Sequence, residues 1–165
     1  MIKIVKILIL FTCFLLVYSS ANSSEQSNLA TLGLNSDVKL HMKIEHFIPK
    51  EHQMKYCKPA FPVDNWKGVC LIDKKPVFGT DWEMPIYILK EAYVVIKKKK
   101  IRLDTSCMYN PWFTGKPDIK NFFIKKTEGG FLINGTFSDG AGAYEAQWFI
   151  IDDASVRTKL RGFNE

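Results

Sequence analysis

The stretch that decides the fold is VKLHMKIE, residues 38–45. Four apolar side chains alternate with polar ones along it: Val38, Leu40, Met42 and Ile44. In an extended chain successive side chains point to opposite faces, so a period of two separates an apolar face from a polar one. This stretch therefore predicts a β-strand that packs one face on a core and turns the other to solvent.

Further along the chain, short strand-like runs occur in pairs, and turn residues separate the two runs of each pair. Four hairpins are predicted, with turns at residues 73–76, 97–100, 128–130 and 152–153. Strands joined by tight turns pair antiparallel, because parallel neighbours need long crossover segments. We therefore expect an all-β domain of about eight strands over residues 37–165, built as an antiparallel sandwich or a small closed barrel.

Upstream of this domain, residues 1–21 have the composition of a secretory signal peptide. Lys3 and Lys6 precede an apolar run over residues 7–17, and Ser19 and Ala21 form a small-x-small cleavage site. The run is too short for the roughly 30 Å hydrocarbon core of a membrane, so cleavage is expected rather than a stable anchor. A secreted or periplasmic protein follows from this prediction.

The mature chain has the length of a single domain and only a mild positive charge. Residues 22–36, rich in serine and asparagine, are expected to be a flexible lead before a monomeric domain. Of the 23 basic side chains, Lys3 and Lys6 leave with the signal peptide, so 21 remain against 17 acidic ones. Part of this small excess sits in Lys97–Lys100, so no nucleic-acid partner is expected.

Three cysteines remain in the mature chain, which leaves one without an intramolecular partner. Cys57 and Cys70 enclose an irregular segment with two prolines, which a covalent clip would stabilise, so this pair is the predicted disulfide. Pairing of Cys70 with Cys107 is the alternative.

Residues that often carry chemistry are present, but they do not form a recognisable motif. His41 and His46 have opposite parity along the first strand, and His52 follows in a loop, so neither a metal site nor a cofactor is expected. A nucleophilic Cys107, or a carboxylate pair of Asp81 and Glu83, would suit a small hydrolase, although no local signature surrounds them.

Aromatic side chains are concentrated in three expected loops, at residues 49–67, 79–85 and 107–117. Loop tryptophan and tyrosine are favoured interface anchors because they combine a large rigid ring with a polar tip. A common binding surface is therefore predicted from Trp66, Trp82, Tyr109, Trp112 and Phe113. The alternative is that these rings cap the ends of the core. The sequence Asn134-Gly135-Thr136 is also a glycosylation acceptor sequence.

These observations favour an exported, non-enzymatic protein that binds and occludes a protein partner, in the manner of an inhibitor or a toxin-immunity protein. Two alternatives stay open. One is an exported hydrolase that uses Cys107, or Asp81 and Glu83, and the other is a β-barrel that carries an apolar ligand.

Overall fold

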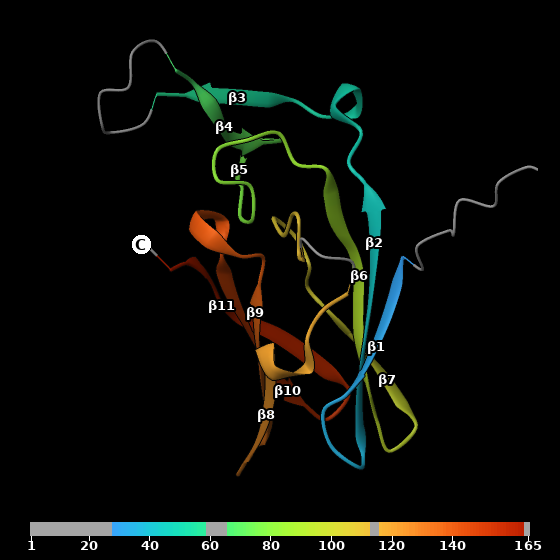
Figure 1. The fold of residues 1–165 in the computed structure, drawn as a ribbon. Coiled ribbons are helices and arrows are strands. Elements are labelled where there is room, and N and C mark those ends of the chain that lie inside the picture. Colours follow the sequence, from blue (N-terminus) through green and yellow to red (C-terminus); the bar gives the residue numbers. More distant parts are fainter. Residues whose placement is uncertain (1–27, 59–65, 113–115, 164–165) are drawn as a thin grey trace, which may run out of the picture.

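The computed structural model describes residues 28–58, 66–112 and 116–163, which form strands and short 3-10 helices (Figure 1). The strands are β1 (Leu29–Gly33), β2 (Val38–His46), β3 (Met54–Cys57), β4 (Gly68–Ile72), β5 (Lys75–Pro76), β6 (Tyr87–Ile96), β7 (Lys99–Leu103), β8 (Phe122–Thr127), β9 (Gly130–Phe137), β10 (Tyr144–Ile151) and β11 (Ala154–Gly162). The 3-10 turns are η1 (Pro49–Glu51), η2 (Ile119–Asn121) and η3 (Gly140–Gly142). The expectation of an all-β chain is confirmed. The described residues hold no helix of the length and hydropathy that crossing a membrane requires.

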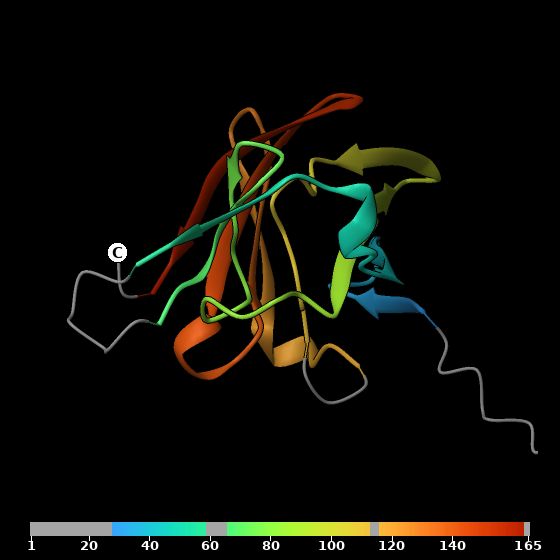
Figure 2. The same ribbon diagram turned by 90° about the horizontal axis from the view of Figure 1, so that it is seen from above.

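Three antiparallel sheets make up the fold, with strand orders β1-β2-β6-β7, β11-β10-β9-β8 and β3-β4-β5. The two four-stranded sheets face each other, and the small third sheet lies across one end of them (Figures 1 and 2). All three sheets are open, because each ends in edge strands that pair on one side only. The closed-barrel alternative is therefore wrong.

The main core lies between the two large sheets and follows the alternation seen in the sequence. Val38, Leu40, Met42 and Ile44 on β2 are buried against side chains of β10, among them Trp148 and Tyr144, which are 1% and 0% exposed. The polar tips of both rings are satisfied, because Trp148 Nε1 donates to the Asp104 carbonyl at 2.9 Å and the Tyr144 hydroxyl to the Tyr109 carbonyl at 3.2 Å. The facing side chains of the two sheets form one buried apolar cluster.

The four predicted hairpins are confirmed as β4–β5, β6–β7, β8–β9 and β10–β11. Two of their turns are tighter than the sequence suggested. Asp73 and Lys74 have φ of 51° and 64°, and Lys97 and Lys98 have φ of 46° and 68°, which matches two-residue hairpin turns. The residues after these turns already belong to β5 and β7.

The flexible lead predicted over residues 22–36 is corrected in part. Leu29–Gly33 form β1, an edge strand that pairs with Lys39–Lys43 of β2. Leu32 packs against the main core, which gives this polar segment enough apolar contact to be ordered. The signal-peptide prediction falls on residues outside those that the structure describes.

One pair of edges between the large sheets is connected by polar contacts. Ser155 Oγ of β11 donates to the Arg102 carbonyl of β7 at 2.5 Å, and Lys99 Nζ lies 2.6 Å from an Asp153 carboxylate oxygen. Arg157 donates to the Ser106 carbonyl at 2.6 Å just beyond β7. These contacts fix β7 and β11 relative to each other.

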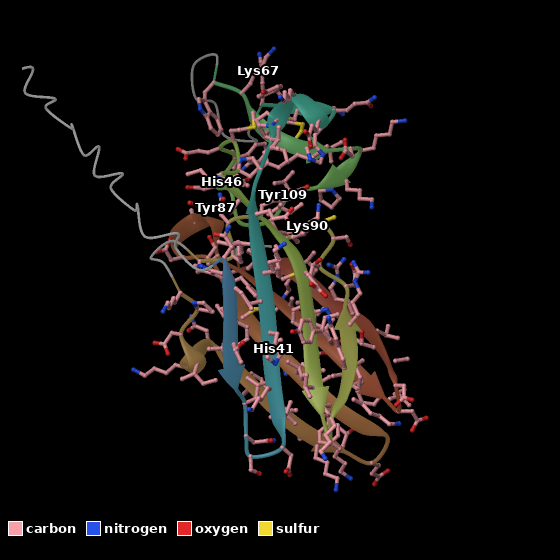
Figure 3. All side chains as sticks on the ribbon, turned by 90° about the vertical axis from the view of Figure 1, so that its right-hand side faces the viewer. His41, His46, Lys67, Tyr87, Lys90 and Tyr109 are labelled. Atoms are coloured by element: carbon pink, nitrogen blue, oxygen red, sulfur yellow. A yellow bond between two sulfur atoms is a disulfide. The ribbon has the colours of Figure 1, made fainter. Side chains whose placement is uncertain are left out.

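The outer face of the first sheet, on which Figure 3 labels His41, carries a row of contacting side chains from β1, β2, β6 and β7. His41 stacks on Tyr93 with ring centroids 4.6 Å apart, and Lys100 Nζ lies 3.7 Å from the centre of the same ring. On the other side, His41 Nδ1 lies 2.9 Å from Thr31 Oγ1 of β1. Partial burial and the charges of Lys39 and Lys100 lower the pKa of His41. The aromatic and cationic groups of this row therefore contact one another.

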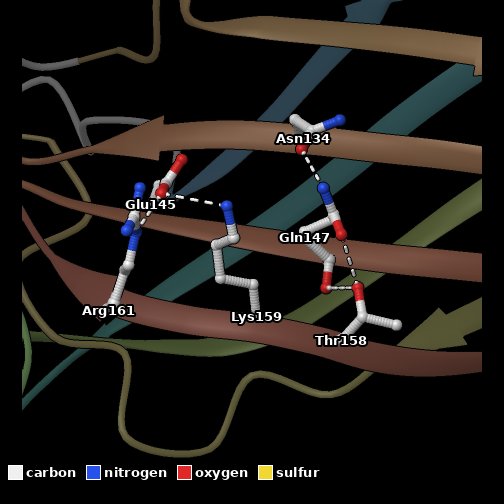
Figure 4. Close-up of polar contacts among 6 residues, drawn as sticks. All are labelled: Asn134, Glu145, Gln147, Thr158, Lys159 and Arg161. Atoms are coloured by element: carbon white, nitrogen blue, oxygen red, sulfur yellow. Dashed lines mark hydrogen bonds and ion pairs between the residues drawn. The ribbon is translucent and has the colours of Figure 1, made fainter.

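The outer face of the second sheet has a matching set of cross-strand contacts (Figure 4). Glu145 of β10 binds both Lys159 and Arg161 of β11, and these two cations lower the pKa of the Glu145 carboxyl. Gln147 Nε2 donates to Asn134 Oδ1 at 2.7 Å, while Thr158 Oγ1 donates to Gln147 Oε1 at 2.8 Å. These polar groups are engaged within the sheet.

Candidate functional site

The third sheet is held on the domain by a second, smaller core, and a disulfide links two of its own strands. Phe47, Val69, Ile72 and Tyr109 form this core beneath the sheet. The predicted bond between Cys57 of β3 and Cys70 of β4 is confirmed, with Cα atoms 5.7 Å apart, and Cys107 is free. Because the disulfide closes the segment that leads to Trp66, it ties that ring to the sheet.

Two of the predicted binding residues come together beside this disulfide. The rings of Trp66 and Trp82 lie 6.2 Å apart, and the two side chains are 40% and 38% exposed. Gly68 lies between them, and a Cβ atom there would come 2.9 Å from Cη2 of Trp66. The close approach of the two tryptophans therefore depends on a residue without a side chain.

The backbone that carries Trp82 forms a tight turn of two residues with positive φ. Asp81 and Trp82 have φ of 46° and 67°, in the left-handed region that large side chains rarely adopt. Hydrogen bonds hold the turn in place, from the Glu83 amide to the Thr80 carbonyl at 2.7 Å and from the Val69 amide to the Trp82 carbonyl at 2.8 Å. The two-residue turns at 73–74 and 97–98 have the same pair of left-handed φ angles, so what distinguishes the turn at 81–82 is the exposed tryptophan that it carries.

Trp82 forms part of the wall of a cavity of about 440 Å³, which we call the aromatic cavity. One side consists of β4 and the loop at residues 76–82, and the other of residues 141–144 with the end of β11. Phe78 and Tyr144 line it with rings 6.2 Å apart, and Phe163, 53% exposed, lies at its rim. The volume is within the range of about 300–1,000 Å³ that is typical of ligand sites.

Two other predicted binding residues, Tyr109 and Trp112, do not line this cavity. Tyr109 is 6% exposed, and burial raises its pKa to about 12, so this ring belongs to the smaller core and not to a binding surface. Trp112 is half-buried and packs against the main core. Phe113 lies outside the residues that the structure describes. The described aromatic rings of these loops are thus divided between exposed positions and the capping of the core.

The sequence analysis did not single out three of the aromatic residues that line the cavity. Tyr144 belongs to a core strand, Phe78 to a hairpin and Phe163 to the end of the chain. Their meeting depends on how the third sheet lies against β10 and β11, which no local pattern encodes.

The proposed catalytic residues show no arrangement that favours hydrolysis. Burial raises the pKa of the Cys107 thiol, while Arg157 acts in the opposite direction with a smaller effect. A neutral thiol is a poor nucleophile. His52 is 2.6 Å from Asp73, in contact with a carboxylate rather than a thiol. Among the described residues, no three His, Cys, Asp or Glu side chains lie close enough to hold a metal ion.

Asn134 lies within β9 rather than in an exposed loop. Its Oδ1 accepts a hydrogen bond from Gln147, and its Nδ2 is shielded from solvent without a hydrogen-bond partner. Glycosylation attaches the sugar to this nitrogen. The folded domain therefore does not present Asn134 as an acceptor.

Comparison with known proteins gives no match to this chain among family models, curated proteins or solved structures. Its function must therefore be argued from the aromatic cavity and its surroundings.

Proposed function

We propose that this chain is an exported, non-enzymatic binding protein that occludes a protein partner with the surface around the aromatic cavity. The observation that carries the proposal is the exposed Trp66–Trp82 pair, in which a tight turn places Trp82 at the wall of the cavity. Exposed tryptophans beside a concave surface are typical of the residues that dominate protein interfaces. On this proposal the domain acts as a monomer that covers a surface of the partner.

Export is supported by the disulfide, which is compatible with an oxidising extracellular or periplasmic environment. The signal peptide proposed for residues 1–21 would direct the chain there. An inhibitor or a toxin-immunity protein would need such a location to meet an exported partner.

The alternatives have less support in the described residues. A hydrolase that uses Cys107 would begin with a thiol whose pKa is raised rather than lowered. Asp81 and Glu83 are both exposed, whereas a carboxyl group that acts as a general acid usually has its pKa raised by burial. A carrier of apolar ligands would need a hollow interior, but the space between the large sheets is filled by side chains such as Trp148 and Phe137.

The test is capture of exported proteins by the immobilised mature chain, compared between wild type, Trp82→Ala and Phe123→Ala. Phe123 is 59% exposed on β8, away from the cavity, and provides a matched loss of an exposed ring. Trp82→Ala should weaken capture of the partner by about 2 kcal/mol, the scale of an interface hot spot. Capture that is equally strong with Trp82→Ala and wild type would contradict the proposal, as would equal losses in both variants.

A further inference from the structure

The aromatic cavity differs in charge from the protein around it. The full sequence has a net charge of +6, yet Asp81 supplies the one charged side chain among the described residues that line the cavity. The remaining lining is aromatic, aliphatic or glycine, with Thr80 as the neighbour of Asp81. Asp81, an exposed residue, is therefore the one acidic residue of this lining that would attract a positively charged group.

The rings supply the second half of this recognition. Trp82, Phe78 and Phe163 line the cavity, and Trp66 lies against Trp82 at its edge. The face of an aromatic ring carries a negative quadrupole that attracts a lysine ammonium, an arginine guanidinium or another organic cation. Tryptophan attracts a cation more strongly than tyrosine or phenylalanine does. Trp82 would therefore contribute the most to binding a cation in the cavity.

Neighbouring cations do not occupy the site. Arg161, next to the lining residue Gly162, binds the Glu145 carboxylate on the outer face of the sheet. Lys75 adjoins Pro76, but its charge acts on Asp73, Asp104 and Cys107 instead. The chain therefore leaves Asp81 without an internal cation in the described structure, although basic residues are abundant.

We propose that the aromatic cavity receives the cationic end of a lysine or arginine side chain that projects from the protein partner. This inference rests on the proposed function, because it assigns the chemistry of one anchor residue on that partner. The exposed rings of Trp66, Trp82 and Phe163 would form an apolar border that excludes water around the inserted side chain.

Two probes isolate the charge: N-acetylarginine methylamide and its neutral isostere N-acetylcitrulline methylamide. Binding to the mature protein is followed by tryptophan fluorescence and by chemical-shift changes in a nitrogen-labelled sample. The arginine probe should bind about fivefold more tightly than the citrulline probe, the scale of a cation–aromatic contact with an exposed partner. Asp81→Asn should remove most of this preference, whereas Glu83→Gln, a change in the next carboxylate along the chain that does not line the cavity, should retain it.

Equal affinity for the two probes, or an unchanged preference in Asp81→Asn, would overturn the inference. Its failure can be told apart from that of the proposed function. If Trp82→Ala abolishes partner capture while Asp81→Asn leaves it intact, the binding surface stands and the cationic anchor falls. If the probes behave as expected but partner capture ignores Trp82→Ala, the cation site stands and the proposed interface falls.

Discussion

Replacement of Gly68 by alanine tests how the two tryptophans are held. The added Cβ would lie 2.5 Å from the Trp82 carbonyl oxygen and 2.9 Å from Cη2 of Trp66. The first neighbour is backbone, and it accepts the 2.8 Å hydrogen bond from the Val69 amide, so it cannot move without breaking that bond. Gly68 has no positive φ, so the substitution adds a steric clash and no conformational strain of its own.

The expected cost is that of overpacking, about 1–3 kcal/mol in the free energy of unfolding. For a domain of this size, a loss of 1 kcal/mol lowers Tm by about 4 °C, so thermal unfolding should shift downwards by about 4–12 °C. Tryptophan fluorescence should change as well, because either Trp66 or Trp82 must move. Gly33→Ala is the matched control, since a Cβ there meets no atom within 4 Å. A Gly68→Ala protein with the Tm and fluorescence of wild type would show that this reasoning is wrong.

Three further predictions address the core, pH and thiol chemistry. Trp112→Ala should lower the free energy of unfolding by about 2 kcal/mol in a denaturant titration, because this half-buried ring packs on the main core. Partner capture should not change. Loss of capture at unchanged stability would show instead that Trp112 contacts the partner. The His52 contact and the Gln53 amide lower the pKa of Asp73 below 3.8, so this carboxylate stabilises the folded state above about pH 4 and the contribution is lost as the pH falls below that value. Asp73→Asn should therefore make Tm fall less steeply between pH 5 and 2. An unchanged fall in Tm would show that protonation of Asp73 does not contribute to the loss of stability in acid. Cys107 should react slowly with a thiol reagent at pH 7 in the native protein and rapidly in denaturant, because the half-buried thiol has a raised pKa; equal rates would contradict this shielding.

The strands could be predicted because each depends on a local pattern. The alternation around Val38 and again around Tyr144 fixes which side chains face inward, and the charged or glycine-containing turns fix where each hairpin reverses. β1 was not predicted because its two leucines, Leu29 and Leu32, are three residues apart and give no period of two, and the strand is ordered through its partner β2. The disulfide could be predicted because its cysteines enclose one irregular segment.

The site could be predicted only in part, because it depends on the packing of elements distant in sequence. The composition of the loops indicated Trp66 and Trp82, but the same reasoning selected Tyr109, which the smaller core buries. Loop composition does not distinguish a ring that faces solvent from one that caps a core, since both need large apolar area. Phe163 and Phe78 enter the cavity through the position of the third sheet, which is a tertiary property.

The order of strands in the two large sheets has a consequence for synthesis of the chain. The sheet β8–β11 is a continuous meander over residues 122–162, whereas the sheet that faces it is complete by Leu103. A ribosome delivers the chain from its N-terminus, so the apolar inner faces of β2 and β6 have no cover until the last quarter of the protein has emerged. During that interval the nascent N-terminal half exposes an apolar surface that promotes aggregation with other chains. A chain cut short before residue 122 should therefore be a client of holding chaperones, rather than a smaller working version of the same protein.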